Sequence, residues 1–158
     1  RTLVPYTTLF RSVFYFYHPL ARLAGVPLHE KNDPYHELWG WPELGAQVDT
    51  LLAAHPEAEL ASDARKTLAY LMFHTTPQRL GAVVYDRNGV VDHHFEISSD
   101  MADHPGDAYV YVSESAPPPG LIASFREVRE LTPPVAEIRG GETVALEAWL
   151  LRGRVEPR

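Results

Sequence analysis

The sequence predicts an α/β fold, a small three-layer sandwich whose mostly parallel sheet ends in a C-terminal antiparallel hairpin. Its 158 residues match the length of one ordinary domain. Strand-like segments alternate with helical periodicity through the first two-thirds of the chain, which favours parallel strands joined by helical crossovers. In the last third, strand-like segments follow one another directly, which favours antiparallel pairing.

Two amphipathic helices are expected in the first half of the chain. The first begins at Pro42, a residue suited to the first turn of a helix, and ends near His55, before Pro56. Its apolar residues recur at helical spacing and are Leu44, Val48, Leu51 and Leu52. The second helix covers residues 64–74, and Asp63 before it is suited to be its N-cap. Its apolar stripe consists of Leu68, Leu71 and Met72.

Strands are expected at Glu57–Ser62, Gly81–Tyr85, Ala108–Val112, Val135–Arg139 and Val144–Arg152. The second of these ends at the turn signal 86–89. Gly140 and Gly141 separate the last two strands and predict a hairpin. Residues 121–130 predict a short helix that leads into a strand, whereas residues 93–101 have no clear pattern.

Composition restricts the classes of function. The chain has 14 basic and 21 acidic residues, a net charge of −7, which argues against a nucleic-acid partner because such a partner requires a basic face. The absence of cysteine excludes disulfides, thiolate nucleophiles and cysteine-based zinc sites. No stretch approaches the ~20 consecutive apolar residues of a membrane span.

We interpret the first twelve residues as different in origin from the rest of the chain. The segment 5–12 can be back-translated into a string that resembles the end of a common short-read sequencing adapter. We interpret residues 1–12 as an assembly artefact that replaces the natural beginning of the chain, the alternative being a natural N-terminal strand. Without Arg1 and Arg11 the chain keeps 12 basic and 21 acidic residues, a net charge of −9.

Residues 13–32 form a segment between this artefact and the domain. Its aromatic cluster, 13–17, precedes the basic residue Arg22. Such a pattern is typical of the interfacial end of a membrane helix, and a buried aromatic strand is the alternative interpretation. The proline-containing stretch that follows predicts an ordered linker leading into the first helix.

Few residues predict chemistry. The segment 92–96 contains metal-ligand types, but the adjacent His93 and His94 would point to opposite faces of a strand, so no metal site is assigned. The chain has neither a Gly-x-Ser-x-Gly nucleophile motif nor a glycine-rich phosphate loop. Arg65 and Lys66 form a small basic spot at the start of the second helix. No catalytic residue and no cofactor are assigned, and a small hydrolase using the two histidines or the preceding Asp92 stays a third hypothesis.

A series of short motifs, taken in order, resembles one family. In Asp33–Leu44 an Asp-Pro pair is followed at short distance by Gly-Trp and then Leu. Arg65–His74 matches a helix of the form Y-x-x-A-S-x-L-x-F-Y, with Arg and His in place of two tyrosines, and His94–Ser98 matches a Q-Y-x-x-W element without its tryptophan. A strand at Ala108–Val112 and a phenylalanine-led strand at Phe125–Leu131 follow. This order is similar to the C-terminal soluble domain of membrane glycosyltransferases related to dolichyl-phosphate-mannose–protein mannosyltransferases and bacterial aminoarabinose transferases.

The resemblance implies that residues 33–154 are the extracytoplasmic C-terminal domain of a polytopic enzyme in the cytoplasmic membrane of a bacterium, on the periplasmic side. Such an enzyme transfers a sugar from a polyprenyl-phosphate donor to a lipid or protein acceptor. Its catalytic residues lie in the membrane portion, so none is carried onto this chain and the fragment is expected to be inactive alone. The implied partners are the missing transmembrane half of the same protein and a lipid-linked sugar or acceptor.

A second hypothesis is a stand-alone α/β binding module that could bind carbohydrate. Its basis is the aromatic set Tyr35, Trp39 and Trp41, whose rings could stack on a sugar or could simply pack the linker onto the domain. The substrate-binding candidates from both hypotheses are Trp39, Trp41, Arg65 and His94.

Overall fold

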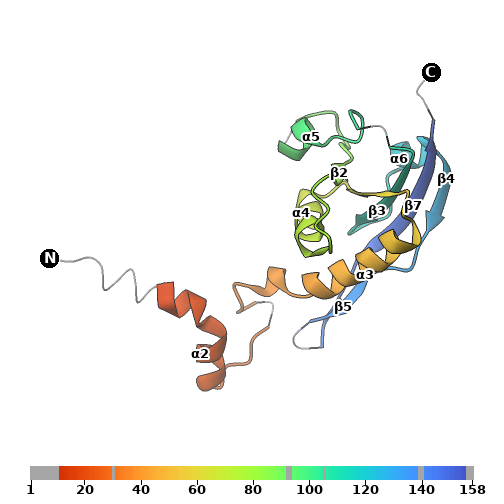
Figure 1. Cartoon of the computed structure of the whole chain (residues 1–158). Helices are drawn as coiled ribbons and strands as arrows, with labels where there is room; N and C mark the ends of the chain where they lie inside the picture. The colour runs from red at the N-terminus through yellow and green to blue at the C-terminus, as the bar shows by residue number, and fades with distance from the viewer. Residues whose placement is uncertain (1–10, 30, 92–93, 105, 139–140, 156–158) are drawn as a thin grey trace. The chain divides into compact units, whose positions relative to one another are not determined.

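The computed structural model describes residues 11–29, 31–91, 94–104, 106–138 and 141–155 (Figure 1). The chain divides into two compact units, unit 1 with residues 1–39 and 139–142 and unit 2 with residues 40–138 and 143–158. Most of the adapter-like segment, residues 1–10, lies outside the described residues, as do Asp92 and His93 of the histidine-containing segment.

Unit 1 contains the helix α2 (Tyr17–Leu23) and the short 3-10 helix η1 (His36–Leu38). Residues 11–15 are also helical, so the interpretation of the aromatic cluster as a buried strand is wrong. Buried Asp33 fixes the linker, because its carboxylate pairs with His18 Nε2 at 2.8 Å and accepts the Tyr35 backbone N–H at 2.7 Å. Among the described residues, every helix falls short of the length and hydrophobicity needed to cross a lipid bilayer.

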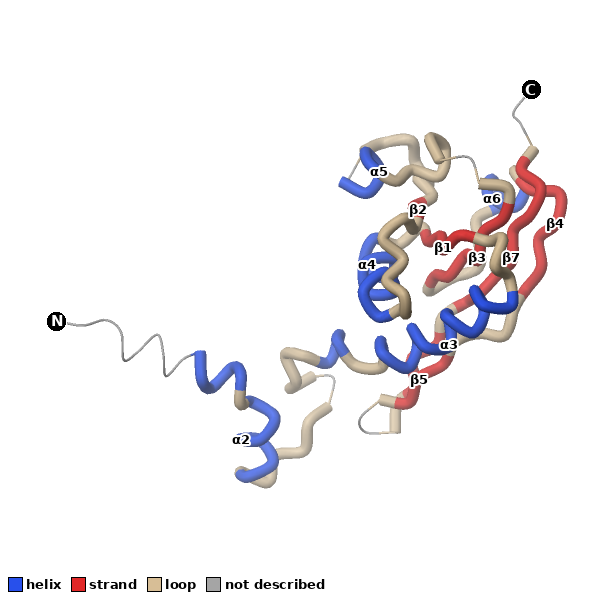
Figure 2. Tube along the Cα trace, viewed as in Figure 1, coloured by secondary structure: helices blue, strands red, loops and turns tan. Residues whose placement is uncertain are grey.

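Unit 2 is built on a five-stranded sheet in the order β2-β1-β3-β7-β4 (Figure 2). The strands are β1 (Glu59–Ser62), β2 (Val83–Val84), β3 (Ala108–Ser113), β4 (Phe125–Glu130) and β7 (Glu147–Arg154). The first three strands of that order are parallel, and β7 then runs antiparallel to both β3 and β4. The predicted α/β class, with a parallel core extended by antiparallel strands, is confirmed.

The predicted C-terminal hairpin is present as β5 (Val135–Glu137) and β6 (Thr143–Ala145), which form a separate two-stranded sheet. The strand expected at 144–152 is divided at Leu146, whose N–H donates to Pro134 O at 2.9 Å. Leu146 is buried in the core, and the chain after it enters the main sheet as β7. The hairpin therefore lies beside the main sheet instead of extending it.

The helices of unit 2 are α3 (Trp41–Ala54), α4 (Arg65–His74), α5 (His94–Ser98) and α6 (Pro119–Ala123). The first two match the predicted helices to within one residue at each end. The short helix expected before β4 is α6. The unpatterned segment 93–101 contains α5, a five-residue helix without a fully buried residue.

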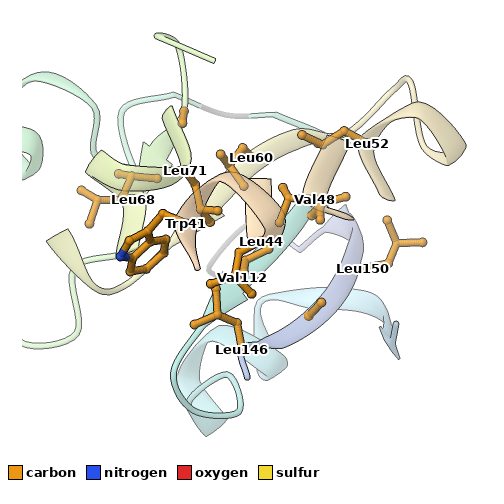
Figure 3. Packing of buried hydrophobic residues seen from close by; sticks show 14 of the residues in the cluster. Trp41, Leu44, Val48, Leu52, Leu60, Leu68, Leu71, Val112, Leu146 and Leu150 are labelled. Carbon is orange, nitrogen blue, oxygen red and sulfur yellow. The ribbon is translucent and has the colours of Figure 1, made fainter. Parts of the chain in front are cut away.

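Alternate residues of the sheet point to opposite faces, as the two-residue period of a strand requires. On the first face, Val110 and Val112 of β3 pack in one cluster with residues of α3 and α4, including Leu44 and Leu68 (Figure 3). On the second face, Tyr109, Tyr111 and Leu151 pack with Leu121 of α6. We call these face one and face two. Because both are covered, the sheet is the middle of three layers.

A close approach of backbones joins α3 to the end of α4. A Cβ atom at Gly45 would lie 2.7 Å from the carbonyl oxygen of His74. Only glycine leaves room for this contact, and it brings α3 and α4 together over face one.

Candidate functional site

Polar side chains gather where β1 and β3 end at the carboxyl edge of the parallel strands. The group comprises Asp63, Arg87, Tyr111, Ser113 and Ser115, and we call it the edge cluster. From β1 the chain passes through α4 to β2 on one side, whereas β3 lies on the other side of β1. Such a switch point at the carboxyl ends of parallel strands is where α/β sheets commonly bind ligands.

Asp63 is the centre of the edge cluster. It follows β1 directly, and its buried carboxylate accepts a 2.5 Å hydrogen bond from the Ser113 hydroxyl. The guanidinium of Arg87 donates to the other carboxylate oxygen and forms an ion pair with it. Arg87 also donates to Ser115 Oγ at 3.2 Å and remains about half exposed, at 49% of its side chain. The cluster therefore connects three segments that are distant in sequence.

The prediction that Asp63 caps α4 is wrong. The N-cap is Ala64, which has extended backbone and no side-chain capping bond. The Ser62 hydroxyl accepts the Ala64 N–H at 3.2 Å, while Asp63 directs both carboxylate oxygens to Ser113 and Arg87. A charge-assisted pair with Arg87 and a hydroxyl bond outcompete a single capping bond for the same carboxylate.

The phenol of Tyr111 reaches the same cluster from β3. No hydrogen bond of ordinary length and angle joins its buried hydroxyl to a described residue. Burial raises the pKa of Tyr111 well above its usual value, and the neighbouring Asp63 carboxylate raises it further. For Arg87, burial is the largest single influence and lowers the pKa, but the interactions with Asp63 and Tyr111 together outweigh it and leave the pKa raised. The phenol therefore stays protonated and the guanidinium stays charged.

The edge cluster is unsuited to nucleophilic catalysis. Ser113 is buried, so a substrate cannot reach its hydroxyl. The carboxylate that accepts the Ser113 hydrogen bond is already paired with the Arg87 guanidinium, so it is not free to act as a general base. What the cluster does offer is a half-exposed guanidinium held in a fixed position.

A cavity of about 230 Å³ lies on face two. Among the described residues, its lining consists of Tyr85, Asp86, Gly89, Asp100, Met101, Ala102, Leu121, Ser124, Phe125 and Arg154. Its apolar members include buried residues of the face-two core. Arg154 is fixed there by a 2.7 Å bond from Nη1 to Met101 O.

The two tryptophan candidates differ in environment. Trp41, only 5% exposed, packs in the face-one core with its ring stacked on Tyr70 at a centroid separation of 4.6 Å. A ring so covered is placed to support α3 rather than to stack on a ligand. Trp39 of unit 1 is half-buried, and its ring meets His18 edge-on with centroids 6.4 Å apart.

Arg65 and His94 are both exposed at the first residues of helices. Arg65 opens α4 and His94 opens α5, where its ring lies 4.1 Å from that of Phe95 between centroids. No hydrogen bond or ion pair links the two side chains. Within the described ranges, no group of three or more His, Asp or Glu residues is arranged to hold a metal ion.

The local sequence patterns predict neither the edge cluster nor the cavity. A signal was present, since Asp63 and Ser113 stand where predicted strands end, the position from which parallel strands present polar groups to a common edge. The local pattern around Arg87 predicts only a turn. The cavity residues give no comparable signal, because they are spread from 85 to 154.

Comparison with protein-family models, curated proteins and solved structures finds no significant match. Function therefore has to be inferred from the motifs and the geometry.

Proposed function

We propose that residues 33–154 are the extracytoplasmic C-terminal domain of a bacterial membrane glycosyltransferase, which transfers a sugar from a polyprenyl-phosphate donor to a lipid or protein acceptor. The ordered series of motifs from Asp33 to Leu131 carries this proposal. The α/β architecture is compatible with it. The edge cluster, which is unsuited to nucleophilic catalysis, suits a domain that supports catalysis carried out elsewhere in the protein.

The segment before the domain supports the proposal independently. Its helical residues expose apolar side chains to an extent unusual for a water-facing helix, with Tyr15 at 83% and Leu23 at 87% exposed. Phe14 and Phe16 are exposed as well, and Arg22 stands in the last turn of α2. Aromatic side chains beside a basic residue are enriched at the membrane–water interface, where lipid would cover them.

The coding sequence upstream of the codon for Val13, read directly from the source DNA, tests the proposal. We expect that region to encode several hydrophobic segments of about 20 residues each. An upstream region that encodes none would overturn the proposal.

Flotation with vesicles of phosphatidylethanolamine and phosphatidylglycerol tests the role of the exposed segment. The chain is expected to float with the vesicles, and the variant combining Phe14→Ser, Phe16→Ser and Leu20→Ser is expected to stay at the bottom of the gradient. The matched control combines Val90→Ser and Val91→Ser, which removes exposed apolar side chains from unit 2. Equal loss of flotation in both variants would show that the effect is not specific to the segment.

A stand-alone binding module is the second candidate function, and the cavity on face two is the observation that favours it. It differs from the first candidate in requiring no membrane-spanning segments upstream. An upstream region without such segments, together with ligand binding by the chain, would favour it.

A further inference from the structure

We infer that the cavity on face two binds a single uncharged sugar ring. This inference does not depend on the membrane attachment proposed above, because every described residue that lines the cavity belongs to unit 2. It also differs from the sugar contact that the sequence suggests for the tryptophans, since neither Trp39 nor Trp41 lines the cavity.

The size of the cavity sets the size of the ligand. Sites for drug-sized molecules occupy roughly 300–1,000 Å³. At about 230 Å³, the cavity accommodates a smaller molecule, of the order of one six-membered ring with its substituents. The lining comes from the loop after β2, the segment 100–102, α6 with the start of β4, and the end of β7.

In each of the two carboxylates of the lining, one oxygen already accepts hydrogen bonds from the backbone. Asp86 Oδ1 accepts the backbone N–H groups of Asn88 and Gly89, at 2.8 and 2.9 Å. Asp100 Oδ1 accepts the N–H of Ala102 at 2.8 Å. These bonds fix the orientation of both carboxylates, and no described residue donates a hydrogen bond to either Oδ2. The two Oδ2 atoms are therefore acceptors suited to ligand hydroxyl groups.

The remaining lining complements the carboxylates. The Arg154 guanidinium, held by Met101 O, adds a donor group. The Ser124 hydroxyl donates to Gly120 O at 2.8 Å, so its lone pairs can still accept. Phe125 and Leu121 supply a buried apolar surface, and Tyr85 adds a partly buried aromatic ring. A sugar ring has both a hydroxyl-bearing edge and an apolar C–H face, and aromatic side chains pack well against the latter.

The charges of the lining favour an uncharged ligand. Asp86 and Asp100 would repel a phosphate or a carboxylate, and Arg154 offsets one of these two negative charges, which weakens the attraction for an ammonium group. A hydroxyl-rich neutral molecule can instead donate to the carboxylates and accept from the guanidinium without leaving a charge unpaired.

A titration of the full chain, monitored by the NMR signals of its backbone amides, tests the inference. The probes are D-glucose, D-mannose, D-galactose and L-arabinose, with D-glucosamine and inorganic phosphate as charged comparisons. At least one neutral sugar should bind with a Kd on the order of 1–10 mM, as expected for so small a ligand. The amides that shift should be those around the cavity, including Gly89, Ala102 and Ser124.

Asp86→Asn and Asp100→Asn sharpen the test. Each Asn retains the Oδ1 that closes the turn and replaces Oδ2 by an amide donor, so binding should weaken at least about fivefold, the loss expected for one hydrogen bond. Asp103→Asn changes an exposed carboxylate of the same loop outside the cavity and should leave Kd unchanged. The amide spectrum reports whether each variant is folded, and the map of shifted amides in the unaltered chain remains decisive if a variant is not.

Three results would overturn the inference. They are the absence of shifts with every neutral sugar, shifts confined to amides distant from the cavity, and binding of only glucosamine or phosphate. Each leaves the proposed membrane attachment untouched. Conversely, sugar binding by a chain whose gene encodes no upstream membrane segments would uphold the inference and overturn that attachment.

Discussion

The two faces of the sheet are covered very differently. Face one lies under α3 and α4, helices of 14 and 10 residues whose apolar stripes fill the space above the strands (Figure 3). Face two is covered by the five-residue α6 and by the segment around Met101. The long helices of face one exclude polar groups and leave little empty volume. The short segments that cover face two leave room for polar groups and for a cavity. We therefore expect face one to determine stability and face two to provide the ligand-accessible chemistry.

The largest effect should come from opening a void on face one. Leu44→Ala removes a fully buried side chain of α3 and should lower the free energy of unfolding by about 3–5 kcal/mol. Leu121→Ala on face two should cost about 2 kcal/mol, because Leu121, although equally buried, already borders the cavity on one side. Urea unfolding at pH 8 measures both. Equal losses would contradict the claimed difference between the faces.

A smaller effect is expected from separating the two helices of face one. Gly45→Ala places a methyl group 2.7 Å from His74 O, a backbone atom that cannot rotate away. Overpacking of this kind should destabilise unit 2 by about 1–3 kcal/mol, despite the better helix propensity of alanine. Gly81→Ala, where no atom lies within 4 Å of the added Cβ, is the matched control. A stabilised Gly45→Ala variant would mean that the helices are not in close contact.

Substitution of two tyrosines of face two, Tyr109 and Tyr111, measures how much the hydrogen bonds of their hydroxyl groups stabilise the domain. Tyr109 Oη donates to His104 O at 2.6 Å and accepts the Gly106 N–H at 2.5 Å, so Tyr109→Phe should cost about 1–3 kcal/mol. Tyr111 Oη makes no hydrogen bond of ordinary length and angle to a described residue, and Tyr111→Phe should change the free energy of unfolding by less than about 1 kcal/mol. Urea unfolding at pH 8 decides, and a larger loss for Tyr111→Phe would contradict the assigned bonding.

The same tyrosines predict a loss of stability in alkali. Burial raises the pKa of both Tyr109 and Tyr111 in the native chain. Above pH of about 10, the unfolded chain loses phenolic protons that the native chain keeps. The unfolded state then binds fewer protons, so the free energy of unfolding falls as pH rises. Urea midpoints at pH 8 and 11 should show this fall, and Tyr111→Phe should make it shallower. An unchanged slope would contradict the prediction.

The sequence was most informative where one local pattern determines the structure. Periodic leucines bounded by Pro42 and Pro56 locate α3 correctly, and the buried run 108–112 locates β3, because its alternate residues must fill both faces. The strand expected at 81–85 is shorter in the structure. There the Ala82 N–H donates to Arg79 O, which holds the first residues in a turn.

The site was less predictable because its residues meet only through the topology. Asp63 is a good local N-cap, yet partners 24 and 50 residues away engage its carboxylate. The Trp41 side chain is of a type that stacks on sugars, but its position at the start of a buried helix places its ring against Tyr70. A pattern read along the chain contains neither the distant partner nor the neighbour across the core.

The sheet order has a consequence for self-association. Its two outer strands are β2 and β4, and an outer strand with free backbone groups can pair with another chain. At β2, the Val84 N–H donates to Ser99 O and its carbonyl accepts the Met101 N–H, so a segment of the same chain occupies that edge. At β4, the edge is protected by four exposed charged side chains, Arg126, Glu127, Arg129 and Glu130. Both edges are thus protected against intermolecular strand addition, one by pairing and the other by charge, and the domain should resist edge-to-edge aggregation.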